Sequence, residues 1–132
     1  MTRRIGDAAE DLVAVWLQSS GWRIIGRNVR LGHGELDIVA VDPGPPAALV
    51  VVEVRWRRDR GFGLPEETFD RHKRDHLRRA VGRLLAGGTL PDGTRLPSLP
   101  IRVDLAAVEP PRRPGDPPRW RHHRSARATR PR

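Results

Sequence analysis

The segment that most constrains the fold is LVVVEVRWR at residues 49–57, a run rich in β-branched residues that predicts a strand. Because side chains alternate between the two faces of a strand, Glu53, Arg55 and Arg57 share one face and leave the other face apolar. Charged side chains inside such a run are costly unless they are paired or coordinate a metal. These residues are therefore candidates for a functional site.

Apolar periodicity and turn residues predict the other elements. They are helices at 5–19 and 71–86, the second with Asp70 as its N-cap, and strands at 22–30, 35–42 and 101–108. Short connections make the first three strands an antiparallel meander, and the second helix crosses over to bring the last strand in parallel. The sequence thus predicts an α/β domain of order α-β-β-β-α-β with a mixed sheet flanked by helices.

Length and composition narrow the protein class. The chain has 132 residues, enough for one domain with a modest core, and no cysteine, which excludes disulfides, thiolate zinc sites and thiol catalysis. The N-terminal segment MTRRIGDAAEDL lacks the apolar stretch of a signal peptide, and no run approaches the roughly 18 apolar residues of a membrane span. We therefore expect a cytoplasmic protein with no membrane partner.

The net charge of +9 is unevenly distributed. Residues 119–132 carry six arginines and no acid, after a proline-rich segment at 110–118. This pattern predicts a domain over 1–109, a stiff linker, and a disordered basic tail. The tail is either a solvated end or a contact for nucleic acid, the commonest polyanionic partner. Candidate nucleic-acid-binding residues are Arg57, Lys73, Arg119, Arg121, Arg124 and Arg127.

Two carboxylates could share one metal ion. Asp37 lies in the predicted strand ELDIVAVD, and Glu53 lies in the next strand along the chain. If these strands are neighbours, Asp37 and Glu53 can hold a hard divalent cation, and Mg²⁺ suits carboxylate and water ligands. Arg55 would then lie beside the attacking water or the scissile phosphate. The alternative interpretation is an inert salt bridge between Arg55 and one of the acids.

Other polar residues give weaker signals. Glu10 lies at the edge of the first helix's apolar stripe, where a surface glutamate is the simpler interpretation. His72 and His76 are spaced i, i+4 on the second helix, which could suit a metal, but no third ligand has suitable spacing and a solvated helix face is favoured. The sequence contains no Walker-type phosphate loop and no legible Ser/His/Asp arrangement.

Several stretches resemble the YraN-type family of uncharacterised bacterial proteins, over roughly residues 8–108. They are AEDLVAVWLQSSGWRIIGRN, GELDIV, VVEVRWR, FGLPEE, the single Lys73, and RVDLAAV. That family is placed by resemblance in the PD-(D/E)XK nuclease superfamily, near archaeal Holliday-junction resolvases. The family's Gly-Glu, Gly-Glu-Ile-Asp and Val-Glu-Val-Lys patterns become Ala9-Glu10, Gly34-Glu35-Leu36-Asp37 and Val52-Glu53-Val54-Arg55 here.

The resemblance implies a restriction-endonuclease-like fold and a Mg²⁺-dependent endonuclease, with Mn²⁺ as an alternative ion. It implies metal binding by Asp37 and Glu53, aided by Glu10 and the Val54 carbonyl. It favours DNA over RNA, including branched or structured DNA, and is compatible with a homodimer.

Arg55 departs from the family, which has lysine at this position. Arginine keeps the charge but is bulkier and does not exchange a proton near neutral pH. Since Lys73 is the only lysine in the chain, one interpretation is a chain-wide drift to arginine without loss of role. The other is a decaying site, which would make the protein a non-catalytic nucleic-acid-binding module on the same fold. A protein-interaction adaptor with a basic tail is a third hypothesis.

Overall fold

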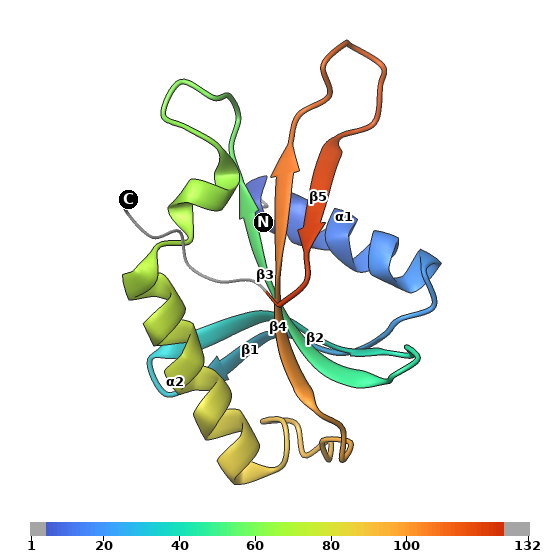
Figure 1. The fold of residues 1–132 in the computed structure, drawn as a ribbon, viewed down its shortest axis with the longest axis vertical. Coiled ribbons are helices and arrows are strands. Elements are labelled where there is room, and N and C mark those ends of the chain that lie inside the picture. Colours follow the sequence, from blue (N-terminus) through green and yellow to red (C-terminus); the bar gives the residue numbers. More distant parts are fainter. Residues whose placement is uncertain (1–4, 126–132) are drawn as a thin grey trace.

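The structure, a computed structural model, describes residues 5–125 as a five-stranded mixed sheet with a helix on each face (Figure 1). The helices are α1 (Ile5–Ser19), α2 (Arg71–Gly87) and a short 3₁₀ helix before α2, η1 (Pro65–Thr68). The strands lie side by side in chain order: β1 (Arg23–Leu31), β2 (Gly34–Asp42), β3 (Ala48–Trp56), β4 (Ile101–Glu109) and β5 (Arg119–His123). No helix in this part of the chain is long and apolar enough to span a membrane.

The pairing of the first four strands follows from their connections. A tight turn at Gly32, which has a left-handed φ of 63°, joins β1 to β2, and these two strands pair antiparallel. β2 and β3 are also antiparallel, whereas the crossover through α2 brings β4 parallel to β3. The predicted mixed α/β arrangement of these elements is confirmed.

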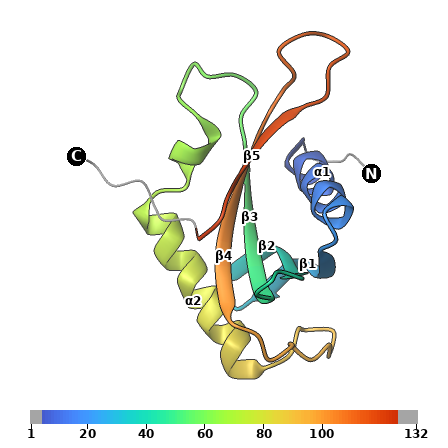
Figure 2. The ribbon, with the colours of Figure 1, turned by 45° about the vertical axis from the view of Figure 1, so that its right-hand side comes forward.

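Both faces of the sheet are covered because β3 alternates between two apolar cores. Val50 and Val52 belong to the core under α1, and Leu49 and Val51 belong to the core under α2 (Figure 2). All four side chains are at most 1% exposed, and burial of each contributes about 1.5–3 kcal/mol. A polar site is therefore confined to the end of β3 where Glu53 and Arg55 replace these apolar residues.

The ends of α2 are fixed by caps. The side chain of Asp70 accepts a hydrogen bond from the Lys73 amide at 2.9 Å, as its predicted role as N-cap requires. Gly88 ends the helix with a left-handed φ of 72° and donates its amide to the carbonyl of Leu84. The caps hold the first turn of α2 in place beside the end of β3, where it borders the site described below.

The segment 119–123 differs from its expected place in a disordered tail. It forms β5, which pairs antiparallel with β4 from Leu105↔His123 to Glu109↔Arg119, so residues 110–118 are the loop between two strands. Trp120 of β5 stacks on Trp16 of α1, with 4.8 Å between ring centroids. The expected tail residue Arg127 lies outside the described residues.

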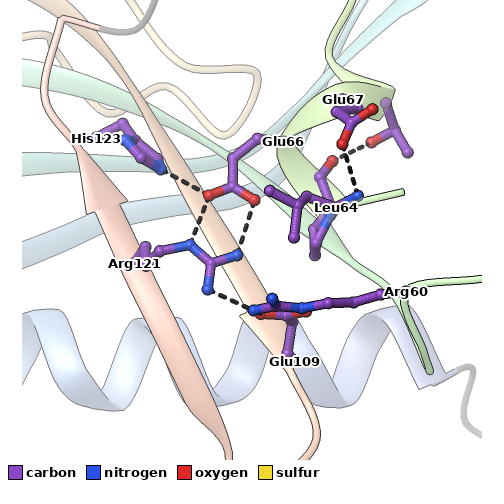
Figure 3. Close-up of polar contacts among 9 residues, drawn as sticks. Arg60, Leu64, Glu66, Glu67, Glu109, Arg121 and His123 are labelled. Atoms are coloured by element: carbon purple, nitrogen blue, oxygen red, sulfur yellow. Dashed lines mark hydrogen bonds and ion pairs between the residues drawn. The ribbon is translucent and has the colours of Figure 1, made fainter.

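The physical reason for this difference is a network of ion pairs around Arg121 (Figure 3). Its guanidinium donates to both carboxylate oxygens of Glu66 at 2.6 and 2.8 Å and to Glu109 at 2.8 Å. Glu109 is 2% exposed and also accepts two hydrogen bonds from Arg60 at 2.8 and 3.0 Å. His123 contacts Glu66 at 2.9 Å. Arginine-rich composition predicted a solvated segment, but these acids give β5 partners inside the fold.

Candidate active site

The central feature of the site is a fork between β2 and β3. The ladder between these strands ends at the pair Ile38↔Val52, while β2 continues to pair with β1 as far as Gly34. At the fork, the Asp37 carboxylate accepts a hydrogen bond from the Val54 amide at 2.8 Å. The side chain thus takes the place of a backbone acceptor and lies in the gap between the strands.

Glu53 meets Asp37 at this fork. Glu53 is 9% exposed. Its burial is the largest of the causes that raise the pKa of its carboxyl well above the usual range. The negative charge of Asp37 and a hydrogen bond between the two carboxyls raise this pKa further, and Arg55 opposes the shift. The fold therefore holds the two carboxyls together in a place where the anionic form of Glu53 is unfavourable without a further cation.

Glu10 approaches from α1, on the other face of the sheet from α2 (Figure 2). Burial, and then the charge of Asp37, raise the pKa of its carboxyl to about 7. With its amide nitrogen turned toward the acids, Asn28 donates to Glu10 Oε1 at 2.8 Å and to Glu35 Oε1 at 3.2 Å. Asn28 orients Glu10, and sequence reasoning missed it. Its signal was an asparagine inside a predicted strand, since asparagine tolerates the left-handed φ of 49° found there.

Arg55 lies next to Glu53, with 3.3 Å between Nη2 and Oε1. Its Nε is buried and has no hydrogen-bond partner among the described residues. A buried donor without a partner is unusual in a native fold. Arg55 is also one of the residues around a pocket of about 330 Å³. The pocket is lined by Glu35, Glu53, Arg55, His72, Lys73, His76, Leu77 and Ala80.

The donor set at the fork fits Mg²⁺. Within residues 5–125, no three His, Asp or Glu side chains are grouped as a metal site, so the carboxylates available together are those of Asp37 and Glu53. The N–H and C=O of one strand residue point to the same neighbouring strand, so the Val54 carbonyl faces the same gap as its amide. Mg²⁺ is commonly held by one or two carboxylates and keeps several waters. His72 and His76 likewise belong to no such group among the described residues.

The remaining candidates for nucleic-acid contact are placed in two regions. Lys73 lines the pocket of Glu53, whereas Arg57, Arg119, Arg121 and Arg124 do not. Arg119 donates to the Pro110 carbonyl at 3.1 Å, and Arg124 lies 3.3 Å from Asp42. With Arg121 held by Glu66 and Glu109, these arginines have partners within the protein. As far as residue 125, the basic C-terminal segment is therefore not assembled with the acids of the fork.

Comparison with known proteins finds relatives without an assigned activity. The sequence model of "Uncharacterised protein family UPF0102" matches residues 9–108. A UPF0102 protein of Symbiobacterium thermophilum is 42% identical over 111 residues, which are 83% of this chain and 86% of that protein. A UPF0102 protein of Bifidobacterium longum subsp. infantis is 33% identical over 80% of this chain and 81% of its own length. One from Roseiflexus castenholzii is 37% identical over 80% and 78%, respectively.

Proposed function

The chain belongs to the uncharacterised protein family UPF0102, the YraN-type family that its motifs resemble, and we propose on that premise that it is a Mg²⁺-dependent endonuclease acting on DNA. The observation that carries the proposal is the meeting of Asp37 and Glu53 at the fork, beside the unpartnered Nε of Arg55. A buried acid gathered with a half-buried acid and a half-buried cation costs stability, and such a cost is typical of a catalytic site.

Each residue has a distinct part in this proposal. Asp37 and Glu53 would hold the ion, with the Val54 carbonyl beside them, and Asp37 is oriented by its bond to the Val54 amide. The ion, when bound, polarises a phosphate oxygen and lowers the pKa of a bound water. Arg55 donates through Nε to a phosphate oxygen and stabilises charge that develops there. Glu10 adds negative charge on the α1 side.

The same geometry supports membership in the PD-(D/E)XK superfamily, with its restriction-endonuclease-like fold. A mixed sheet covered by a helix on each face, with an acid at the end of one strand and Glu-x-Arg on the next, is the arrangement that the family motifs imply. We extend the proposal to branched or structured DNA and to a homodimer, in line with the resolvase resemblance. Mn²⁺ would serve in place of Mg²⁺.

One observation favours a second function, a DNA-binding module without catalysis. Arg55 is paired with Glu53 at 3.3 Å, and an arginine so engaged neutralises an acid that would otherwise hold the ion. Arginine also cannot exchange a proton near neutral pH. In the enzyme, the acids of the fork are needed to cut DNA, whereas the binding module does not cut DNA.

Cleavage assays on the full chain test the proposal. Linear, nicked, single-stranded and four-way DNA are each incubated with Mg²⁺, Mn²⁺, Ca²⁺ or a chelator. We expect the wild type to cut with Mg²⁺ or Mn²⁺ and not with Ca²⁺ or a chelator. The cutting rate should fall roughly 10²-fold or more in Asp37→Asn and Glu53→Gln. The matched control is Asp116→Asn, which removes the same charge from an exposed position in the β4–β5 loop and should cut at the wild-type rate.

Arg55 variants separate the two functions. Arg55→Lys restores a compact donor and should preserve or raise the cutting rate, whereas Arg55→Gln should be nearly inactive. DNA affinity should change little in Arg55→Lys, which keeps the charge, and should fall modestly in Arg55→Gln, which loses one phosphate contact. If neither the wild type nor Arg55→Lys cuts any of the four substrates, the binding-module function replaces the enzyme.

A further inference from the structure

The charge of α2 is arranged against the stability of the helix itself. The helix carries six lysines and arginines and a single acid, Asp75. Its first turn contains no acid and its last turn contains no base. The helix dipole favours the reverse, with anions near the N-terminus and cations near the C-terminus. A cationic first turn that weakens its own helix indicates that these charges act on a partner outside the helix.

Part of this charge lies along one line of the helix surface. His72, His76, Arg79 and Arg83 are separated by four, three and four residues, which places them above one another on an α-helix. All four are exposed, and together they form what we call the basic edge of α2. Its two ends are 11 positions apart, or about 16 Å at 1.5 Å per residue.

The basic edge leads directly to the candidate active site. His72 and His76 line the same pocket as Glu53 and Arg55. At the far end, Arg83 donates to the Leu31 carbonyl at 3.2 Å, which places that end beside the turn between β1 and β2. The edge is thus a continuous row of N–H donors that begins at the pocket and runs away from it along α2.

The opposite side of α2 provides an internal comparison. Arg74 and Arg78 line a separate hollow with Leu77, Val81 and Val103. They belong to the same helix and have the same charge as Arg79 and Arg83, but they lie off the row that begins with His72 and His76 at the pocket of Glu53. The two pairs of arginines, Arg74/Arg78 and Arg79/Arg83, therefore carry the same charge but lie on different sides of the helix.

We propose that the basic edge of α2 binds the phosphodiester backbone of a DNA arm and leads it to the pocket of Glu53 and Arg55. This inference rests on the proposed function, since it assumes that DNA is the substrate. The length of the edge matches about five nucleotides of one strand along B-DNA, at 3.4 Å each. Guanidinium and imidazole N–H groups bind phosphate oxygens and position a duplex without reading its sequence.

The edge also explains how an anion reaches an acidic site. Glu35 and Glu53 line the pocket and repel a phosphate, and the metal would act only once the phosphate is near. Glu35 lies 3.6 Å from Arg30, which offsets part of that repulsion. His72 and His76 of the edge line the same pocket, with Lys73 beside them, so attraction by the edge can bring a phosphate to the acids before it contacts the metal.

Binding of labelled 20-base-pair duplex and four-way DNA tests the inference, with a chelator present so that cutting cannot interfere. Arg79→Gln/Arg83→Gln should weaken binding roughly 10-fold or more, and should reduce the slope of log affinity against log salt by about 0.9 for each lost phosphate contact. The matched control, Arg74→Gln/Arg78→Gln, removes the same charge from the other side and should bind within about 2-fold of wild type. Thermal unfolding of each variant verifies that it folds.

A single substitution tests the inference without removing a contact of the fold. Arg79→Gln alone removes a side chain that makes no hydrogen bond or ion pair within the described residues, and it should still lower the salt slope by about 0.9. Equal weakening by the two double variants would show a non-specific effect of charge and overturn the inference, as would a wild type that binds no DNA. Selective loss in the basic-edge variants with no cutting by the wild type would keep the inference and reject the nuclease.

Discussion

The Asp37 carboxylate accepts the hydrogen bond of the Val54 amide at 2.8 Å, where a backbone carbonyl of β2 would lie in a continuous ladder. This contact joins the two strands at the point where they separate. It also fixes the acid between the α1 and α2 faces of the sheet, so that Glu53 and Glu10 can both act on it. The same contact gives the site its geometry and its electrostatic strain.

Glu53→Gln should make the metal-free protein more stable. Burial and Asp37 raise the pKa of Glu53. Stability from such a group is present at low pH and is lost as the pH rises from the ordinary pKa of glutamate through the raised one. At pH 7 a neutral amide avoids this cost, and a gain of about 1 kcal/mol would raise the Tm by about 4 °C. Thermal unfolding in the presence of a chelator measures this change in Tm. An unchanged or lower Tm in Glu53→Gln would show that the charge of Glu53 does not destabilise the fold.

Mg²⁺ should stabilise the wild type and not Asp37→Asn. An ion that binds only the folded chain adds RT ln(1 + [L]/Kd), about 2.7 kcal/mol at 100 times Kd. A Tm that rises with the concentration of Mg²⁺ or Mn²⁺ is the expected result, and this measurement does not depend on cutting. Asp116→Asn serves as the control and should respond as the wild type does. An equal response in Asp37→Asn would place the ion elsewhere.

Acid should weaken the attachment of β5. Hydrogen bonds from Arg121 lower the pKa of Glu66 to about 2, and those from Arg60 and then Arg121 do the same for Glu109. For depressed carboxyl pKa values, the stabilisation is full above the ordinary pKa of glutamate and is lost as the pH falls from about 4.5 toward 2. Denaturant unfolding between pH 6 and pH 2.5 should show this loss. Glu66→Gln should show a shallower dependence.

The Arg121 network also predicts the outcome of truncation. A chain ending at residue 125 keeps β5 and every contact of Arg121, and it is the reference for a shorter truncation. A chain ending at residue 118 loses Arg121, leaves the buried Glu109 with one partner, and should lose roughly 3 kcal/mol. Arg121→Gln should lose a similar amount. Equal stability of the two truncated chains would show that β5 is dispensable.

The charged face of β3 could be predicted from sequence because strand alternation is a local rule. Glu53 and Arg55 share the face that the pattern assigned, and the crossover through α2 follows from its length. The fork could not be predicted, since ELDIVAVD alternates through Asp37 without a break. Whether two strands separate depends on their partners and not on the residues of one strand.

β5 shows the opposite limit of sequence reasoning. RWRHH is basic and follows a proline-rich segment, so composition favoured solvent. Its partners, Glu66 and Glu109, lie 55 and 12 residues before Arg121. Glu109 follows an apolar strand and gave no sign that it would be buried. Only the assembled fold brings these charges together.

Lys73→Gln should raise the stability of the fold and lower its affinity for DNA. Lys73 is the third residue after the N-cap Asp70, where glutamine can complete a capping box and where a cation opposes the helix dipole. The free energy of unfolding should therefore be about 0.3–1 kcal/mol higher in the variant than in the wild type. The same change removes a cation from the pocket of Glu53, so affinity for DNA should fall, with a salt slope lower by about 0.9. Arg74→Gln is the control on the next residue: it should leave DNA binding near the wild-type value. A stabilised Lys73→Gln that binds DNA as tightly as wild type would show that the first turn of α2 does not contact the substrate.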